Sequence, residues 1–439
     1  MASKWQPNKQ LGPQDLETFA GQRGIHYILF AYIDILGVHR GKLVPKSAVN
    51  KLAEDGGRFG QIVFRQSAAN PDMIVVPDLT TLIQLPWKPE FAWVMCDLYS
   101  SAGVLFEESP RLALKRQIER LSKLGKNWVL KCGLEFEFYL VNKDGRDVAD
   151  KLDERPGYGS CFRTDSLMRS SKVLTRICDV IDQLQWHPYQ IDHESGSGQY
   201  EINCHYTDAM TMADRHVFFK YVCQSISEEE GVRITFMPKP FEAKSGNGLH
   251  VHVSIWEGDK NIFLDQSGEL GLSQTAYYFL AGVLHNAKAL CAILCPTVNS
   301  YKRLVAAGWC PNRITYTGDN RSHMIRIPGP GRFEIRLADG AVNAYLYQAA
   351  VIAAGIDGIE RKLDPGRRCD GDGYKGEPEG AEYLPQNLLD AIRELKKNRV
   401  LYEALGVDCM DALTTRKEQE WLSYMRHLTE WECTHTLDC

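Results

Sequence analysis

The first hundred residues contain short apolar runs separated by turn residues. The stretch HYILFAYIDILGVHRGKLVP, residues 26–45, has two such runs around a glycine, which predicts a β-hairpin. Residues 71–87 and 91–100 predict further strands, and the prolines near them suggest sheet edges. We therefore expect a small strand-rich domain over residues 25–107, after an N-terminal extension of residues 1–24.

The stretch ESPRLALKRQIERLSKLG, residues 108–125, carries the signals of a helix instead. Ser109 can cap its start, Pro110 suits the first helical position and Gly125 follows its end. We place a domain boundary just before this helix, so that a larger domain covers residues 108–439.

The larger domain mixes strands and helices irregularly, which indicates an α+β fold rather than repeated βαβ units. The apolar stretch 276–296 is interrupted by polar residues, so a buried helix fits it better than a membrane span. The predicted strands lie at 129–142, 248–256 and 333–337. The predicted helices lie at about 166–185, 208–229, 273–294, 342–361, 386–405 and 416–431, with a glycine- and charge-rich loop at 366–381.

The strand GLEFEFYL, residues 133–140, alternates apolar residues with Glu135 and Glu137. Two like charges on one strand face repel each other, and a half-buried carboxylate loses solvation. Either this face is simply wet, the more common case for a lone ExE, or a strongly positive group lies over it.

Three other segments place acidic, imidazole and guanidinium groups in similar settings. Carboxylates and imidazoles together could surround Mg²⁺ or Mn²⁺, and the absence of cysteine from these segments argues against structural zinc. A lone HxH is more often structural, but the combination favours a metal site. The segments are HESGSGQYE with Glu194 and Glu201, GLHVHVS with His250, His252 and Ser254, and GRFEIRL with Arg332, Glu334 and Arg336.

Arginines are dense between residues 303 and 336 and are interleaved with Gly and Pro. These arginines could simply form surface ion pairs. Alternatively, the loops that carry them could converge on one place and form an anion-binding site. Metals and arginines without a basic domain indicate small anionic ligands, such as a nucleoside triphosphate and a carboxylate. No P-loop or kinase glycine loop is present.

The overall composition argues against some classes of function. A formal net charge of -5 and the lack of a basic run give no footprint for nucleic acid. The N-terminus lacks a signal-peptide core, and the 13 scattered cysteines include no CxxC pair. We expect a cytoplasmic protein with buried free thiols and with neither nucleic-acid nor membrane partners.

The motifs together resemble the glutamine synthetase superfamily, in the family's order, from about residue 25 to 435. They read ExE, HE…GQxE, GxGLHxHxS, NSYKRL, NRSxxIRIP and RxExR. The resemblance implies a small β-grasp-like N-terminal domain and a larger catalytic domain, built on a curved antiparallel sheet with flanking helices. It also implies a homo-oligomer of stacked rings, a dodecamer, whose active sites are shared between subunits.

The resemblance further implies a role for each motif residue. Glu137, Glu194 and Glu201 would hold one cation, and Glu135, His250 and Glu334 the other. Gly246, Asn247, Arg303 and Arg336 would bind glutamate. His252, Ser254, Arg326 and Arg332 would contact ATP. Arg321 would face the transferring phosphoryl group, and Asp34, supplied by a neighbouring subunit, would bind and deprotonate the amine.

One departure bears on the amine. The family's flap usually reads KRLVPGYEAP, whereas this chain reads KRLVAAGWCP, with Trp309 at the glutamate position. An indole cannot accept a proton, but it could line an alkyl pocket or stack on an alkylammonium; the alternative is that it only packs the loop. This flap and the run DGAVNAYL resemble the branch that joins glutamate to alkylamines through a γ-glutamyl phosphate, with methylamine favoured.

Other functions remain open from the sequence. An ammonia-using glutamine synthetase is the first alternative, and a γ-glutamylpolyamine synthetase, which would need a second anionic subsite, is the next. A catalytically inactive, ring-forming relative is a hypothesis of a different class. The complete set of candidate metal ligands and arginines argues against it, because a scaffold would tolerate their loss.

Overall fold

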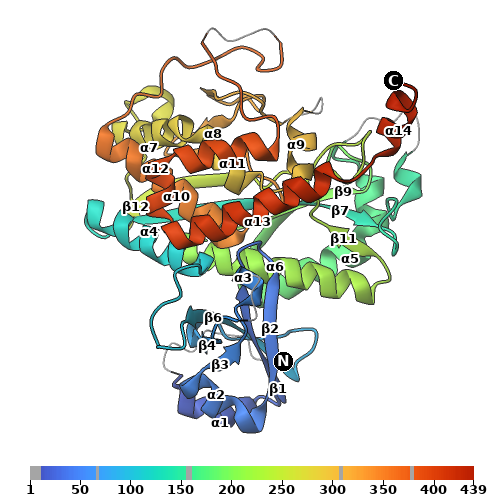
Figure 1. Cartoon of the computed structure of the whole chain (residues 1–439), viewed down its shortest axis with the longest axis vertical. Helices are drawn as coiled ribbons and strands as arrows, with labels where there is room; N and C mark the ends of the chain where they lie inside the picture. Colours follow the sequence, from blue (N-terminus) through green and yellow to red (C-terminus); the bar gives the residue numbers. More distant parts are fainter. Residues whose placement is uncertain (1–10, 66–68, 155–160, 306–309, 376–379) are drawn as a thin grey trace.

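The computed structural model describes residues 11–65, 69–154, 161–305, 310–375 and 380–439 (Figure 1). Its fold is mixed α+β, as the sequence predicted. A six-stranded sheet is built from β1–β6, and a ten-stranded sheet from β7–β16. The smaller sheet and its helices form one end of the molecule, and most helices cover the larger sheet (Figure 1). The proposed division of the chain into domains stays a prediction.

The smaller sheet begins with the predicted hairpin of β1 (Tyr27–Ile33) and β2 (His39–Pro45). β1 also pairs in parallel with β6 (Phe91–Tyr99), which is therefore central. The expectation of edge strands from nearby prolines was wrong for β4 (Met73–Pro77) and β6, because β4 lies between β6 and β3 (Gly57–Phe59) and β6 lies between β1 and β4. Pro77 is tolerated there as the last residue of its strand. The remaining elements are α1 (Leu16–Gln22), α2 (Val49–Asp55), α3 (Ile62–Arg65) and β5 (Ile83–Gln84).

The larger sheet is centred on the long strand β7 (Val129–Val141) and follows the order β14-β15-β16-β12-β7-β9-β8. All neighbours in this order pair antiparallel except β14 and β15. The strands are β8 (Pro188–His193), β9 (Gln199–Cys204), β12 (Val251–Glu257), β14 (Tyr316–Thr317), β15 (Ile325–Gly329) and β16 (Arg332–Ile335). Short strands β10 (Thr207–Asp208) and β11 (Arg233–Thr235) pair with β7, and β13 (Lys260–Asn261) pairs with β12.

Several helices lie close to where the sequence placed them. These are α4 (Pro110–Leu124), α5 (Thr164–Gln183), α6 (Ala209–Glu229) and α10 (Ala344–Arg361). The Ser109 hydroxyl accepts from the Leu112 amide at 3.4 Å, as expected for an N-cap. α10 is buried along nearly its whole length, which makes it the central helix of the core.

Three predicted helices are in fact interrupted. The stretch 273–294 forms α7 (Gln274–His285) and α8 (Ala287–Leu294), bent by 74°. The stretch 386–405 forms α11 (Leu388–Lys397) and α12 (Arg399–Ala404). At the C-terminal end, α13 (Val407–Met425) begins earlier than expected and α14 (Glu430–Thr436) is separate. α9 (Val298–Val305) was not predicted.

In the described part of the chain, no single helix has the length and apolar character needed to cross a membrane. The bent pair α7 and α8 meets that test only when the two helices are taken together. Most side chains of both helices are buried in the protein core.

Candidate active site

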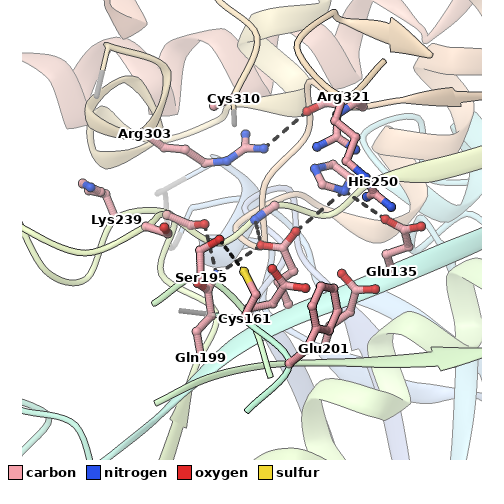
Figure 2. Close-up of a pocket in the computed structure, with 17 residues that line it drawn as sticks. Glu135, Cys161, Ser195, Gln199, Glu201, Lys239, His250, Arg303, Cys310 and Arg321 are labelled. Atoms are coloured by element: carbon pink, nitrogen blue, oxygen red, sulfur yellow. Dashed lines mark hydrogen bonds and ion pairs between the residues drawn. The ribbon is translucent and has the colours of Figure 1, made fainter. Parts of the chain in front are cut away.

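A cavity of about 580 Å³ opens beside the middle of β7. Its walls come from β7, β9, the segment after β8, the segment before β12, α9 and the β15–β16 region, so residues far apart in sequence meet there (Figure 2). The predicted site residues that line it are Glu135, Glu137, Glu194, Glu201, Gly246, His250, Arg303, Arg321 and Arg336.

The carboxylates of this cavity are crowded. Glu137 and Glu201 lie directly opposite each other on the antiparallel strands β7 and β9, a pairing that is destabilising for like charges. Burial, and then the charge of Glu194, raise the pKa of Glu137 to about 8. Burial and the neighbouring glutamates also raise the pKa of Glu201 well above its usual value. Because the charged forms are disfavoured together, the cluster fits one or more divalent cations, which would neutralise it.

The imidazoles complete this acidic cluster. His250 Nδ1 lies 3.0 Å from Glu135 Oε2 and 3.6 Å from oxygens of both Glu137 and Glu334. Burial lowers the pKa of His250 to about 4, so the ring is neutral and can ligate a metal. Ligand atoms of Glu135, His252 and Glu334 also lie within 4.8 Å of one another. Both imidazoles therefore border Glu135, and the choice of His250 as the ligand stays a prediction.

Guanidinium groups surround the same carboxylates. Glu334 is fully buried and accepts from Arg336 Nη1 at 2.5 Å and from Arg326 Nη1 at 2.9 Å. Arg303 is also buried, and its Nη1 donates to the Leu337 carbonyl at 2.9 Å, which fixes its head group at the cavity wall. Arg303, Arg321 and Arg336 line this acidic cavity, an arrangement suited to an anionic substrate held beside cations.

A second cavity, of about 490 Å³, lies next to the first and shares Glu135 with it. Three residues predicted to contact ATP line this second cavity: His252, Ser254 and Arg332. Arg332 Nη1 donates to His252 Nδ1 at 2.7 Å, and His252 Nε2 donates to Glu135 at 2.9 Å. Arg326, the fourth predicted ATP contact, lines neither cavity as formed by the described residues, but it donates to Glu334 at the site.

Sequence reasoning missed the aromatic wall of this second cavity. Tyr189, Tyr206 and Trp256 line it, and Tyr206 and Trp256 stack at 6.4 Å with Lys131 over the indole. Flat apolar rings beside basic groups suit a nucleotide base. Only Trp256, two residues after Ser254 in the same strand, had a neighbouring motif that could have revealed it.

Cys161 and Phe162 also line the first cavity, and no sequence motif indicated them. Both have positive φ angles, 71° and 55°, which are rare for side chains of this kind. Gln199, within the predicted GQxE motif, donates its amide to Glu137 at 3.2 Å and to Asn247 at 3.0 Å. Asn247 itself is buried and does not line the cavity; its amide donates to the Met237 carbonyl at 2.9 Å and so holds the preceding loop.

Among the described site residues, Asp34 also lines neither cavity of its own chain. Asp34 is buried at the β1–β2 turn, where it accepts from the Leu36 and Val38 amides and pairs with Arg40 at 2.9 Å. Its assigned role requires a neighbouring copy. Trp309 lies outside the described residues.

Comparisons with known proteins agree with this geometry. The family model for the glutamine synthetase catalytic domain matches residues 107–436. The chain belongs to the glutamine synthetase family. A glutamine synthetase of Rhizobium meliloti (strain 1021) is 44% identical over 97% of this chain and 99% of its own length. A glutamate–methylamine ligase of Methyloversatilis universalis is 39% identical over 98% of this chain and 100% of its own length.

Solved structures extend this comparison. A structure described as a GmaS/ADP complex superposes with a TM-score of 0.93 at 46% identity, covering 97% of this chain and 100% of its own. A ligand-free GmaS structure gives a TM-score of 0.92. This glutamine synthetase family member is therefore an enzyme that ligates an amine to glutamate. The family generally uses ATP and divalent metals, acts on small molecules and is typically oligomeric.

Proposed function

We propose that this enzyme joins the γ-carboxylate of glutamate to a small alkylamine, with methylamine favoured, and converts ATP to ADP and phosphate. The observation that supports this proposal most strongly is the pair of adjoining cavities. One collects four glutamates and three arginines, the other offers aromatic rings, and Glu135 belongs to both. This arrangement supports the transfer of a phosphoryl group between a nucleotide and a carboxylate substrate.

In this proposal each wall of the site has a separate task. Mg²⁺ or Mn²⁺, bound by Glu137, Glu194 and Glu201 on one side and by Glu135, His250 and Glu334 on the other, would neutralise phosphate charge. Arg303 and Arg336, with Gly246 and Asn247, would orient glutamate. Arg321 would face the phosphoryl group in transfer, and His252, Ser254, Arg326 and Arg332 would hold ATP.

The reaction then proceeds in two displacements. A glutamate side-chain oxygen attacks the γ-phosphorus, and the bond from that phosphorus to the ADP oxygen breaks. The neutral amine attacks the resulting acyl phosphate and phosphate leaves. Because an alkylammonium has a pKa of about 10, a base must remove its proton first. Asp34 of a neighbouring copy in the stacked-ring homo-oligomer, which we propose to be a dodecamer, would take this role.

The lining of the first cavity supports an alkyl group on the amine. Of the described lining residues, only Cys161, Phe162 and Cys310 carry apolar side chains, among many charged ones. Phe162 is 69% exposed, so its ring is available to a ligand. Burying one methyl group is worth about 0.8 kcal/mol, and an aromatic face also attracts an alkylammonium. The identity to GmaS supports the same choice.

An amine panel tests the proposal. Purified enzyme with ATP, glutamate and either Mg²⁺ or Mn²⁺ is assayed with ammonia, methylamine, ethylamine and putrescine, and kcat/KM values are compared. We expect methylamine to exceed ammonia. The 44% identity to a protein named glutamine synthetase favours ammonia as the second candidate. A tenfold or greater preference for ammonia would establish that candidate instead.

A further inference from the structure

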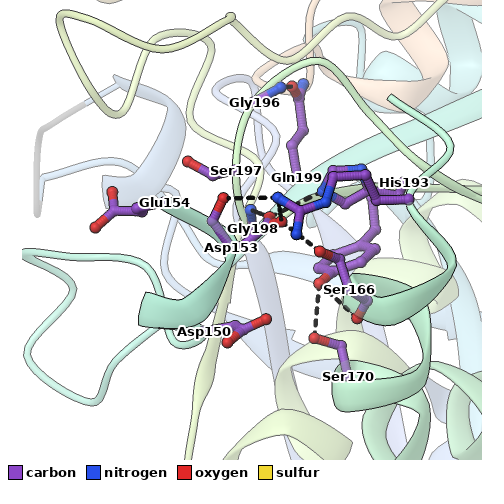
Figure 3. A network of polar contacts seen from close by, with 12 residues as sticks. Asp150, Asp153, Glu154, Ser166, Ser170, His193, Gly196, Ser197, Gly198 and Gln199 are labelled. Atoms are coloured by element: carbon purple, nitrogen blue, oxygen red, sulfur yellow. Dashed lines mark hydrogen bonds and ion pairs between the residues drawn. The ribbon is translucent and has the colours of Figure 1, made fainter. Parts of the chain in front are cut away.

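A buried carboxylate outside both cavities fastens the loop that carries Glu194. Asp153 lies in a short 3₁₀ helix, Lys151–Glu154, with its side chain 1% exposed. Its Oδ2 accepts from His193 Nε2 at 2.8 Å and from the Gly198 amide at 2.6 Å (Figure 3). Those two donors stand at either end of residues 194–197, so one carboxylate oxygen closes the loop.

The other carboxylate oxygen of Asp153 contacts a second segment, residues 163–166, at the start of α5. It accepts from the Ser166 hydroxyl in α5, and Arg163 Nη1 lies 3.4 Å away. Arg163 follows Cys161 and Phe162, which line the first cavity. The Phe162 amide donates to the His193 carbonyl at 2.8 Å, so the two segments are also joined directly. Asp153 therefore holds two adjacent parts of the cavity wall together.

Hydrogen bonds also link this loop to the acidic cluster. The Glu194 amide donates to the Gln199 carbonyl at 2.9 Å, and the Gln199 side chain donates to Glu137 at 3.2 Å. The loop has little freedom to relax, because Gly198 has φ +79° and a Cβ there would lie 3.0 Å from Val148. Displacing Gly198 or His193 would move Glu194 and the donor to Glu137 together.

We propose that Asp153 is a positioning residue for the divalent-cation site: it touches neither substrate nor metal but fixes the carboxylates that do. This inference rests on the metal site of the proposed function. Groups that orient metal ligands in this way typically change metal affinity by about 10–100-fold when they are lost. A merely structural role would instead lower the melting temperature and leave the affinity of the folded protein unchanged.

The test measures Mn²⁺ binding directly on the full chain, without ATP or glutamate, from the electron paramagnetic resonance signal of free Mn²⁺. We expect Asp153→Ala to weaken binding by about tenfold or more. The matched control is Asp150→Ala. Asp150 accepts from the Leu152 amide of the same short helix at 3.1 Å and pairs with Arg169 of α5 at 2.7 Å, so its loss disturbs that helix without removing the acceptor of His193 and Gly198. We expect this control to bind Mn²⁺ as the parent does.

Two further variants separate geometry from charge and keep the test decisive if Asp153→Ala does not fold. Asp153→Asn keeps an oxygen where His193 and Gly198 donate, whereas Asp153→Glu keeps the charge but displaces it by a methylene. A positioning role predicts that the Asp153→Asn protein binds Mn²⁺ more tightly than the Asp153→Glu protein. The reverse order, or parent affinity in the Asp153→Ala protein, overturns the inference. If the parent protein itself binds no Mn²⁺, the proposed metal site fails as well, which distinguishes the two failures.

Discussion

At the scale of single residues, the opposed carboxylates of Glu137 and Glu201 should cost stability whenever no cation lies between them. Folding raises the pKa of Glu201, so its ionised form destabilises the folded state as pH rises above the unfolded pKa. We expect Glu201→Gln to raise the melting temperature of the metal-free protein at pH 7.5. The same variant should lose most of the stabilisation that the parent gains from Mg²⁺ or Mn²⁺, as well as its activity.

Thermal melts with a chelator and with added dication measure both effects. Glu119→Gln is the control, since Glu119 lies on the surface of α4 beside Lys123 and should melt as the parent does in both conditions. A Glu201→Gln protein less stable than the parent in chelator would contradict the electrostatic account.

The second prediction for a single residue concerns the exposed ring of Phe162. If its face contacts the methyl group of the amine, Phe162→Ala should lower the ratio of kcat/KM for methylamine to that for ammonia. The expected loss is about fourfold, from about 0.8 kcal/mol for one buried methyl group. Phe91→Ala, which removes a ring stacked on Tyr27 in the smaller sheet, is the control and should leave the ratio unchanged.

At this scale, the sequence could predict site residues that belong to a recognisable motif, but not Cys161 and Phe162, which lie outside every motif. Period-two alternation placed Glu135 and Glu137 on one face of β7 because the strand is long and regular. Cys161 and Phe162 enter the cavity through an unusual backbone and through hydrogen bonds to residues 193 and 194. No local pattern encodes such contacts between segments distant in sequence.

At the scale of elements, α4 is tied to the smaller sheet and to α6 through one buried arginine. Arg111 lies 2.8 Å from Asp78 and 2.7 Å from Asp97, near the smaller sheet, and 3.1 Å from Asp214 of α6. Removing one partner from a buried ionic network leaves the others uncompensated, which costs about 3–5 kcal/mol. We expect Arg111→Ala to lower the free energy of unfolding by about that amount.

Denaturant or calorimetric unfolding checks this value. The control is Arg116→Ala on the same helix, because Arg116 forms an exposed pair with Glu107 at 2.5 Å and should contribute about 0–1 kcal/mol. Equal losses in the two variants would mean that burial of Arg111 does not decide its contribution.

Contacts between elements also explain why helices that are interrupted in the structure were predicted as continuous. Hydrophobic periodicity runs through Asn286, yet its amide donates to Gly282 and to Asp357 of α10, and the chain turns there. Asn398 similarly ends α11 and caps α12 by accepting from the Leu401 amide at 2.9 Å. Asparagine favours such breaks, but only the packed partner decides whether the chain bends.

At the scale of the whole molecule, one residue of the proposed site lies away from both cavities of its own chain. Asp34 lies at the β1–β2 turn and lines neither cavity of its own chain, whereas Arg321 lines the first. The two residues should therefore act in one site only when they come from different copies. In that case Asp34→Asn and Arg321→Gln should each inactivate the enzyme, and mixing them should restore activity.

The amount restored follows from symmetry. In rings reassembled from equal parts of the two variants, a site is intact when one copy supplies Asp34 and its neighbour supplies Arg321, which happens in about a quarter of sites. If both residues served the same chain, every copy would carry a defect and mixing would restore nothing. Mixing without prior dissociation is the control. Activity after reassembly that stays at the level of this control would remove Asp34 from the shared site and leave amine deprotonation to a group within the cavity itself.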